Sequence, residues 1–224
     1  MTPNVVGFDT STAATSACVL RSDGEAFEVL PATERLFEPP GHSRELLPAV
    51  AEAMRRAGLG WGEIGAIAVG TGPGTFTGLR IGVATARSLA RARAIELRPV
   101  SSLAALAAGA GADVALALID ARRGEVFGAL YERSEPVVEP FVDRPEAVAA
   151  RLGDRARAAL AVGDGSVKFQ EVLEAAGIQV AARESRSHVV SALQVCRLSA
   201  VAQATPPEAV LPTYLRDPDA IPQS

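Results

Sequence analysis

The chain has 224 residues, of which 48% are hydrophobic and 21% are charged, so it can bury a sizeable core in one large domain or two small ones. Its formal net charge of −4 disfavours unaided binding to RNA or DNA, because Lys and Arg supply most of the affinity for a phosphate backbone. No run approaches the roughly 20 apolar residues of a membrane span, and residues 1–9 lack the basic segment of a secretory signal, so we expect a soluble, cytoplasmic protein without membrane contact.

The chain begins with a predicted antiparallel unit. Runs of β-prone residues at Val5–Asp9, Thr15–Arg21 and Ala26–Leu30 predict three strands. The second and third runs are separated by Ser22-Asp23-Gly24, which is typical of a hairpin turn. The polar loop Thr10–Ala14 joins the first two strands.

A helix is predicted after a loop that is rich in Pro and Gly. Ser43 is placed to cap its N-terminus, and Gly58 is placed to end it. Between them, apolar residues recur at helical spacing: Leu46, Leu47, Val50, Ala53, Met54 and Ala57.

The next segment has the rhythm of an α/β layer. The apolar run Ile64–Val69 predicts a strand, and a glycine-rich loop, Gly70–Gly74, follows it. A long helix is then expected over Thr77–Ala92, and a short strand over Ile95–Pro99.

The second half repeats the opening pattern. Val114–Asp120 predicts a buried strand that ends in aspartate, Ala121–Gly124 a polar loop, and Glu125–Glu132 a returning strand. A strand that ends in aspartate and leads through a loop to another strand also occurs around Asp9, which suggests an internal duplication despite slight literal identity. The remaining expected elements are a helix near Pro145–Leu152, a strand and turn at Leu160–Ser166, helices near Val167–Ala176 and Val189–Gln203, and an irregular tail from Thr205.

The segment GTGPGTFTGLRIG, residues 70–82, first suggests phosphate binding, because a glycine-rich loop before a helix can present backbone amides to an anion. It lacks the Gly-Lys-Ser/Thr ending of a Walker loop, and Thr75 occupies the last glycine position of a dinucleotide fingerprint. Lys168 is the only lysine among the 22 basic residues, so no other lysine is available for a phosphate loop. The motif by itself therefore disfavours nucleotide binding.

The same helix carries small residues every four positions, at Gly78, Gly82, Ala86 and Ala90. Each glycine costs a helix interior about 1 kcal/mol relative to alanine, and close approach of another helix would compensate for it. The pattern leaves open whether that helix belongs to the same chain or to another subunit.

Asp9 and Asp120 end equivalent strands and invite two interpretations. They could coordinate a hydrated Mg²⁺ beside a nucleotide phosphate. Alternatively, each could accept hydrogen bonds from its own loop, as Asp often does. Nothing else in either loop favours the metal, so the capping interpretation is preferred.

The remaining chemical side chains suggest no metal site and no nucleophile. His42 and His188 are far apart, and Leu46 rather than histidine follows His42 by four residues, so we expect surface or capping roles for both. Cys18 and Cys196 lie in apolar runs without a second thiol nearby, so we expect buried, unpaired cysteines.

Six segments, taken together and in order, resemble the TsaB (YeaZ) family. The segment at 70–90 is highly specific and the others are individually weak. The segments are GFDTSTAATSACVL at 7–20, GHSRELLPAV at 41–50, GTGPGTFTGLRIGVATARSLA at 70–90, DARRGEVFGALY at 120–131, VGDGSVKF at 162–169 and PTYLRDPDA at 212–220.

The resemblance implies an α/β protein with an actin-like (ASKHA) fold of two RNase H-like lobes, the second of them reduced. We expect the N-terminal lobe at residues 1–104 and the C-terminal lobe at 105–224, with the last helix packing back toward the first lobe. Residues 162–169 resemble the adenosine-side loop of actin-like ATPases and are interpreted as a relic of the fold.

The resemblance also implies a function, namely a non-catalytic scaffold subunit in the synthesis of threonylcarbamoyladenosine (t(6)A37) in tRNA. Such a subunit pairs with the catalytic TsaD, is joined by the ATPase TsaE, forms a homodimer when alone and meets tRNA only through the complex. We expect no cofactor, metal or catalytic residue, because the HxxxH metal site of TsaD is absent. The expected partner interface comprises Ser43, Leu46, Leu47, Val50, Met54, Gly78, Ile81, Gly82, Thr85 and Ala86.

Two alternatives from other classes remain open. An actin-like ATPase or small-molecule kinase would require saturable binding of magnesium-ATP. A peptidase related to the glycoprotease family would require a metal or nucleophile that the sequence does not reveal.

Overall fold

Two five-stranded sheets form the frame of the molecule. The computed structural model describes residues 3–216. The first sheet contains β1 (Asn4–Asp9), β2 (Ser16–Leu20), β3 (Ala26–Val29), β4 (Ile64–Gly70) and β5 (Glu96–Val100). The second contains β6 (Val114–Arg122), β7 (Glu125–Glu132), β8 (Glu135–Asp143), β9 (Leu160–Val162) and β10 (Gln179–Val180).

The two sheets have the same topology. Their strand orders are β3-β2-β1-β4-β5 and β8-β7-β6-β9-β10. In each, the first three strands along the chain pair antiparallel, and the last two join the sheet in parallel. The two-lobed α/β fold expected from the sequence is confirmed, and the shared topology agrees with the suggested duplication.

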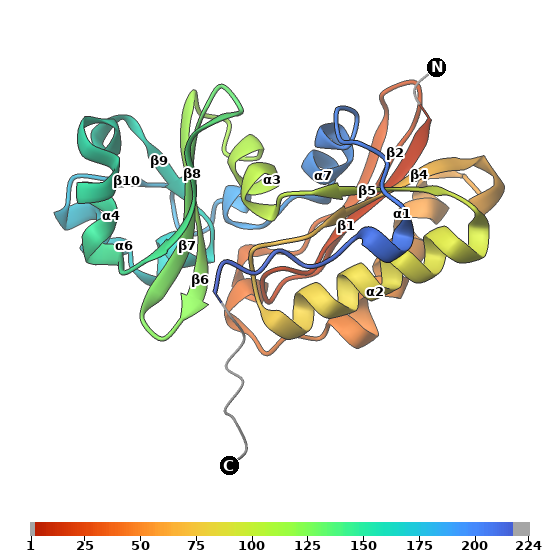
Figure 1. Ribbon diagram of the computed structural model, residues 1–224, viewed down its shortest axis with the longest axis horizontal. Coiled ribbons are helices and arrows are strands. Elements are labelled where there is room, and N and C mark those ends of the chain that lie inside the picture. Colours follow the sequence, from red (N-terminus) through yellow and green to blue (C-terminus); the bar gives the residue numbers. More distant parts are fainter. Residues whose placement is uncertain (1–2, 217–224) are drawn as a thin grey trace, which may run out of the picture.

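Helices complete both lobes (Figure 1). They are α1 (His42–Ala57), α2 (Phe76–Arg93), α3 (Ser102–Ala108), α4 (Pro145–Leu152), α5 (Asp164–Lys168), α6 (Gln170–Ala175) and α7 (Ala192–Leu198), with short 3-10 turns at Thr33–Phe37, Trp61–Glu63, Gly153–Ala158, Arg186–His188 and Pro207–Ala209. Helices α1 and α2 pack on the outer face of the first sheet, and α4 and α6 on the outer face of the second. Helices α3 and α7 lie between the sheets. The second lobe is reduced in its helices, since α4, α5 and α6 have 8, 5 and 6 residues against 16 in α1 and 18 in α2.

Small and large side chains alternate along the central strands, and this explains why helices cover both faces of each sheet. In β4, Ala66 and Ala68 face the core between the lobes, whereas Ile67 and Val69 face α1 and α2. In β6, Ala115 and Ala117 face the same inter-lobe core, and the leucines that alternate with them face outward. Successive residues of a strand point to opposite faces. Small side chains therefore face the junction, which leaves room for α3 and α7 between the two sheets.

Several predicted boundaries were wrong. Helix α1 begins at His42 with Gly41 before it, so Ser43 lies inside the first turn and is not its cap. The helix expected over Val167–Ala176 is two helices, α5 and α6, which are separated at Phe169. The last helix, α7, is shorter than expected at both ends: it starts only after Ser191, whose side chain accepts a hydrogen bond from the backbone of Gln194, and it ends at Leu198.

Three helices or strands had no prediction, namely α3, β8 and β10. Strand β8 contains Pro136 and Pro140, which disfavour a strand when read from sequence alone. The strand occupies the edge of its sheet, where a residue without an N–H is tolerated. Tertiary position therefore overrides the local signal.

The lobes share chain segments across their boundary. The expected boundary between residues 104 and 105 falls inside α3, between the two sheets. Helix α7, from the C-terminal part of the chain, packs on β1 and β2 of the first lobe, where a Cβ at Gly7 would collide with Cys196 Sγ. Beyond α7, Thr205 and Thr213 donate backbone hydrogen bonds to Leu97 and Thr71 of the first lobe. Residues 217–220 of the last family-like segment lie outside the described residues.

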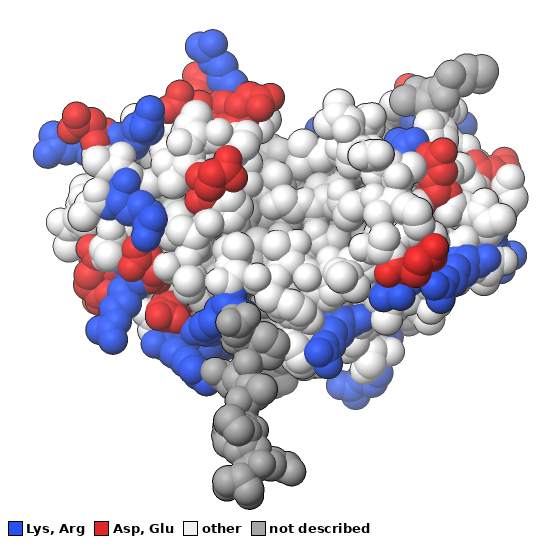
Figure 2. Space-filling model, in the orientation of Figure 1, with Lys and Arg blue, Asp and Glu red and all other residues white. Residues whose placement is uncertain are grey.

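Charged side chains lie mainly over the outer parts of both lobes, and the band between them carries few charges on the face in Figure 2. Within residues 3–216 no helix is both long enough and apolar enough to cross a membrane.

Candidate functional site

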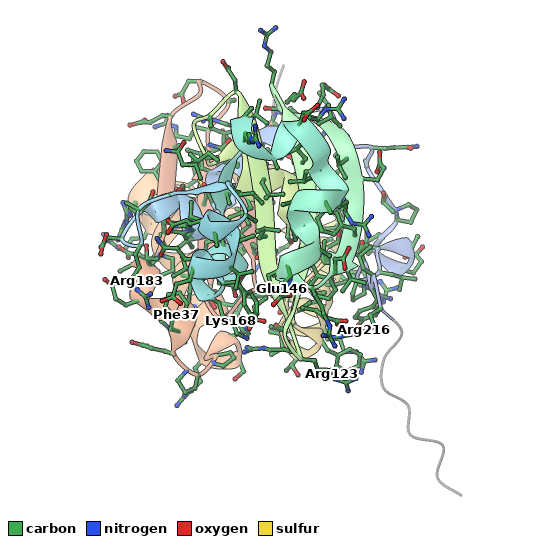
Figure 3. All side chains as sticks on the ribbon, turned by 90° about the vertical axis from the view of Figure 1, so that its left-hand side faces the viewer. Phe37, Arg123, Glu146, Lys168, Arg183 and Arg216 are labelled. Atoms are coloured by element: carbon green, nitrogen blue, oxygen red, sulfur yellow. The ribbon has the colours of Figure 1, made fainter. Side chains whose placement is uncertain are left out.

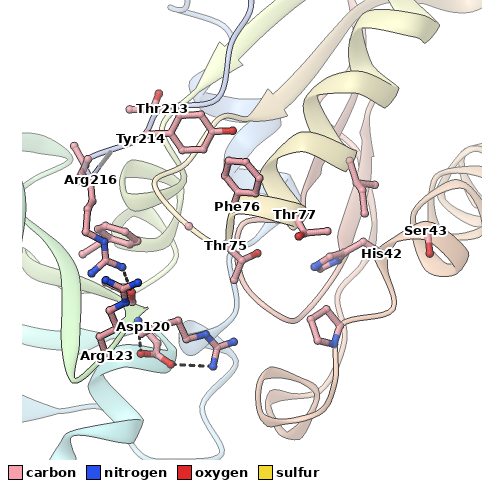
Figure 4. A pocket seen from close by; sticks show the side chains of 18 residues that line it. His42, Ser43, Thr75, Phe76, Thr77, Asp120, Arg123, Thr213, Tyr214 and Arg216 are labelled. Carbon is pink, nitrogen blue, oxygen red and sulfur yellow. Dashed lines mark hydrogen bonds and ion pairs between the residues drawn. The ribbon is translucent and has the colours of Figure 1, made fainter. Parts of the chain in front are cut away.

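A pocket with a volume of about 730 Å³ opens where the two lobes meet (Figure 4). Its first-lobe wall comes from His42 and the first turn of α2. Its second-lobe wall comes from the end of β6, Asp120–Arg122, and from Arg123 in the turn that follows, and the C-terminal segment Thr213–Arg216 forms a third side. Pockets of this size accommodate small molecules.

Asp9, at the end of β1, is engaged by the protein itself. It is 1% exposed. Its Oδ1 accepts hydrogen bonds from the Ser11 amide at 2.7 Å and the Ser11 hydroxyl at 2.6 Å, and its Oδ2 accepts one from Ser102 Oγ at 2.6 Å. Burial raises the pKa of Asp9 and outweighs these hydrogen bonds, which lower it. The geometry agrees with the capping interpretation.

Asp120, its counterpart at the end of β6, forms the centre of an ion-pair cluster. Lys168 Nζ lies 3.0 and 2.9 Å from its two carboxylate oxygens, and the Arg122 amide donates to Oδ1 at 3.0 Å. The Arg122 guanidinium is 3.3 Å from Oδ2. The only lysine of the chain thus pairs with a carboxylate of its own lobe. No group of three or more His, Cys, Asp or Glu residues that could hold a metal occurs in the described part of the chain.

We expect Lys168→Gln to lower the free energy of unfolding by about 1–2 kcal/mol, because it leaves a carboxylate that is only 7% exposed with a weaker set of partners. The expected loss is no larger because the Lys168 side chain is 41% exposed and solvent screens its charge. Chemical denaturation of Lys168→Gln and of Lys168→Arg, which retains the charge, measures the effect. Equal stability of Lys168→Gln and wild type would contradict the role of this ion pair.

Asp164, at the start of α5, holds the backbone at Asp120 by a hydrogen bond. Its Oδ1 accepts a hydrogen bond from the Asp120 amide at 3.1 Å. Burial raises the pKa of Asp164 to about 6, with the negative charge of Asp120 adding to the effect. The family-like segment at 162–169 therefore contributes Asp164 and Lys168 to one cluster. Figure 3 shows Lys168, Arg123 and Arg216 along the lower edge of the second lobe.

The small-residue ridge of α2 packs inside its own lobe. Thr10 Oγ1 donates a hydrogen bond to Gly78 O at 2.8 Å. A Cβ at Gly82 would collide with Thr10 Oγ1. Ala86 and Ala90 belong to the core between α2 and the first sheet. What approaches the glycines is therefore the loop after β1 rather than a helix.

The ten residues of the expected partner interface divide into two groups. Six are buried in the lobe and have little surface left for a partner: Leu46, Val50, Met54, Gly78, Gly82 and Ala86. Four retain accessible surface on α1 and α2: Ser43, Leu47, Ile81 and Thr85. The apolar area expected from Leu46, Val50 and Met54 is used within the lobe. The interface itself stays a prediction, and it now depends on the accessible group.

Both histidines are buried, so the expectation of surface positions was wrong. His188 Nδ1 accepts a hydrogen bond from the Gly163 amide at 3.1 Å, and its Nε2 lies 3.0 Å from Ala182 O. His42 is 3% exposed, and its Nδ1 lies 2.8 Å from Thr15 Oγ1. The buried, unpaired state expected of Cys18 and Cys196 is confirmed.

Sequence reasoning missed the residues that complete the pocket. Arg122 and Arg216 stand far apart in the chain and belong to no recognisable spacing. Arg216 reaches the second lobe, where it donates to Glu125 at 2.5 Å and to Ala121 O at 2.6 Å. Only the folded chain brings these side chains together.

Comparison with known proteins gives relatives over nearly the whole length. A family model described as "TsaD: tRNA N6-adenosine threonylcarbamoyltransferase" matches residues 39–220. The protein called tRNA threonylcarbamoyladenosine biosynthesis protein TsaB in Escherichia coli (strain K12) is 31% identical over 229 residues, which cover 95% of this chain and 94% of that protein. The protein of the same name in Bacillus subtilis (strain 168) is 28% identical and covers 95% of this chain and 93% of its own length.

Solved structures give the same assignment. YeaZ from Pseudomonas aeruginosa superposes with a TM-score of 0.77 at 29% identity, covering 96% of this chain and 100% of that one. An uncharacterized protein with similarity to peptidase YEAZ, also from Pseudomonas aeruginosa, gives a TM-score of 0.80 at 30% identity over the same shares. Ethanolamine utilization protein EutJ from Carboxydothermus hydrogenoformans shares the fold alone, at 14% identity and a TM-score of 0.50 over 87% of this chain and 89% of that one. Since the similarity to TsaB and YeaZ runs through both lobes and the loops around the pocket, the chain belongs to the TsaB (YeaZ) family.

Proposed function

We propose that this chain is a non-catalytic scaffold subunit of the machinery that makes threonylcarbamoyladenosine (t(6)A37) in tRNA. The observation that carries the proposal is the similarity to the TsaB biosynthesis protein of Escherichia coli, which extends over 95% of the chain. The match to the TsaD family model over residues 39–220 supports a relationship to the transferase of the same chemistry.

The state of the two strand-end aspartates supports a non-catalytic role. Asp9 is held by Ser11 and Ser102, and Asp120 is held by Lys168 and Arg122. Either carboxylate would have to give up these partners to take part in phosphate or metal chemistry. The actin-like ATPase or kinase alternative would be favoured by saturable binding of magnesium-ATP to the isolated chain.

One contact between a serine and a histidine resembles a peptidase site, but its surroundings do not favour the peptidase alternative. Ser166 Oγ lies 3.4 Å from His188 Nδ1, which resembles a nucleophile and its base. Ser166, however, donates its hydroxyl proton to Gly163 O at 2.7 Å, and both side chains are fully buried. A peptide substrate does not reach this serine without local unfolding.

We place the partner on the exposed face of α1 and α2. The proposed partner is a TsaD-like catalytic subunit, joined by a TsaE-like ATPase, with tRNA bound only through the complex and a homodimer formed when the chain is alone. Leu47 is 56% exposed on α1, and Ile81 and Thr85 lie half-buried on α2. A large apolar side chain with this exposure gains free energy when a partner covers it.

We expect Leu47→Glu to weaken binding of a TsaD-like subunit by about tenfold or more, because the complex would bury an unpaired charge. The monomer should keep its thermal stability, since Leu47 is exposed in it. A pull-down with the TsaD-like subunit, together with thermal unfolding, measures both quantities.

The matched control is Val201→Glu, which places the same charge at a position that is 90% exposed and outside α1 and α2. If Leu47→Glu binds as well as this control, the pairing surface lies elsewhere. If neither protein nor wild type retains a TsaD-like subunit, the scaffold function itself is wrong.

A further inference from the structure

The last residues that the structure describes, Thr213–Arg216, cross from the first lobe to the second. The Thr213 amide donates a hydrogen bond to Thr71 O at 2.7 Å, directly after the end of β4 in the first lobe. Three residues later, the Arg216 guanidinium donates to Glu125 at 2.5 Å in the second lobe. This segment, which we call the strap, forms the third side of the pocket and joins the two lobes there (Figure 4).

At its first-lobe end the strap is held by aromatic contacts. The ring centroids of Tyr214 and of Phe76, in the first turn of α2, lie 5.5 Å apart. The Arg80 guanidinium lies 3.7 Å from the centroid of the Phe76 ring, and its Nε donates to the Tyr214 hydroxyl at 3.3 Å. Stacked rings and a cation over a ring are stabilising contacts, and they add to the backbone hydrogen bond of Thr213. This end of the strap is therefore held in several ways at once.

At its second-lobe end the strap depends on the polar contacts of Arg216. The guanidinium donates a hydrogen bond to Ala121 O at 2.6 Å, beside its ion pair with Glu125. The side chains of Arg216 and Glu125 are 31% and 32% exposed. Water and dissolved ions weaken an ion pair with this exposure. The second-lobe end is therefore the weaker of the two.

The turn that Arg216 contacts has an unfavourable backbone conformation. Arg122 at the end of β6 has a φ of 64°, and Arg123, which follows it, has a φ of 55°. Two successive residues with positive φ are typical of a tight hairpin turn, which favours Asn and Gly at these positions. Arg216 holds Ala121 O on one side of this turn, and the Arg122 amide donates to Asp120 Oδ1 on the same strand. Without Arg216, we expect this part of the pocket wall to relax.

The lobes also touch on the side of the molecule away from the strap. Thr33 Oγ1 of the first lobe donates to Ser185 O at 3.1 Å, and Arg186 donates to the backbone of the first lobe at 3.0 Å. Figure 3 shows Phe37, from the same 3-10 turn as Thr33, on one side of the molecule and Arg216 on the other. Helices α3 and α7 lie between the two sheets. Loss of the strap would therefore leave the lobes joined but able to move about these contacts.

We propose that the strap restrains the two lobes and closes one side of the pocket, and that it releases reversibly at its Arg216 end. Release frees the turn after β6 and opens the pocket on this side. The first-lobe end stays bound to Phe76 and Thr71. The proposal concerns the motion of the two lobes and does not depend on the proposed scaffold function.

Spin labels on the two lobes measure the restraint. Ala51→Cys on α1 and Glu146→Cys on α4 place the labels at exposed positions, and the native cysteines are buried. Pulsed electron paramagnetic resonance should give a narrow distribution of distances when Arg216 is present and a broader one in Arg216→Gln. Sodium chloride at about 1 M should broaden the distribution when Arg216 is present, because it screens the ion pair, and should change Arg216→Gln little.

Amide hydrogen exchange, followed by NMR, locates the end that releases. In Arg216→Gln, the Arg122 amide should exchange about fivefold faster or more, because an ion pair and a hydrogen bond beside it are lost. The Thr213 amide should keep its protection, since its bond to Thr71 O remains. Glu125→Gln, which removes only the ion pair, should give a smaller change of the same kind.

The matched control is Arg157→Gln, which makes the same charge change at an exposed position outside the strap and should behave as wild type does. If Arg216→Gln matches this control in both measurements, the strap does not restrain the lobes. If the Thr213 amide loses its protection together with the Arg122 amide, the strap releases at its first-lobe end and the proposal is wrong. If thermal unfolding shows that Arg216→Gln has lost its fold, the response to salt when Arg216 is present decides, and an unchanged distribution of distances would overturn the proposal.

Discussion

Replacing Gly82 with leucine is expected to lower the free energy of unfolding by about 2–6 kcal/mol. Overpacking alone costs about 1–3 kcal/mol. The new side chain also enters the space of Thr10 Oγ1 and so disrupts the buried hydrogen bond from Thr10 to Gly78 O, which adds about 1–3 kcal/mol. The sequence alone left open a folded monomer with weakened association. Because Gly82 packs against Thr10 of the same lobe, we expect the substitution to destabilise the fold rather than only the association.

Ala84→Leu is the control for this experiment, since Ala84 lies on the exposed face of the same helix. It adds the same leucine side chain without a collision and is expected to change stability by less than about 0.5 kcal/mol. Chemical denaturation of the two variants and of wild type gives the comparison. If Gly82→Leu is as stable as Ala84→Leu but is defective in self-association or in binding a TsaD-like subunit, the small residues of α2 lie at the subunit interface after all.

Replacing Asp164 with asparagine is expected to stabilise the protein by about 3 kcal/mol at neutral pH and by almost nothing near pH 4. The folded state raises the pKa of Asp164 from its ordinary value of 3.8 to about 6, chiefly by burial. A raised pKa means that the folded state favours the protonated carboxyl, whose contribution to stability is complete below pH 3.8 and is lost as the pH rises through about 6. Asparagine stays neutral and can accept the hydrogen bond from the Asp120 amide through its own oxygen.

The measurement is the difference in unfolding free energy between Asp164→Asn and wild type, followed by urea denaturation across this pH window. Asp9, whose pKa burial also raises, contributes equally to both proteins and drops out of the difference. Asp154→Asn, at an exposed position of the same lobe, should give a difference near zero throughout. A difference for Asp164→Asn that does not grow with pH would show that the buried carboxylate is stabilised when charged.

Elements with strong local signals were predictable. Gly58 adopts a left-handed conformation, with φ of 66°, where the sequence places the end of α1. The long helix after the glycine-rich loop was also expected, as was the strand from Val114, which was predicted to end at Asp120 and ends at Arg122. In each case the signal lies within a few residues, because hydrophobic spacing and end residues act locally.

Elements with weak or conflicting local signals could not be predicted from the sequence. Strand β8 carries two prolines, and only its place at a sheet edge makes it a strand. The start of the last helix was predicted too early because an apolar run does not reveal where Ser191 caps it. Here the decisive interaction is a contact with another part of the chain or a single hydrogen bond.

By itself the sequence determined the two-lobed α/β fold and the family, since both depend on patterns and segments that keep their order along the chain. Only the tertiary structure decided that the glycines of α2 receive the loop after β1 rather than a partner, because spacing records that a close neighbour is needed but not which one. It also decided the pocket, where His42, Thr75, Arg122 and Arg216 meet from positions up to 174 residues apart. No periodicity links such residues, because the packing of one lobe against the other sets their distances.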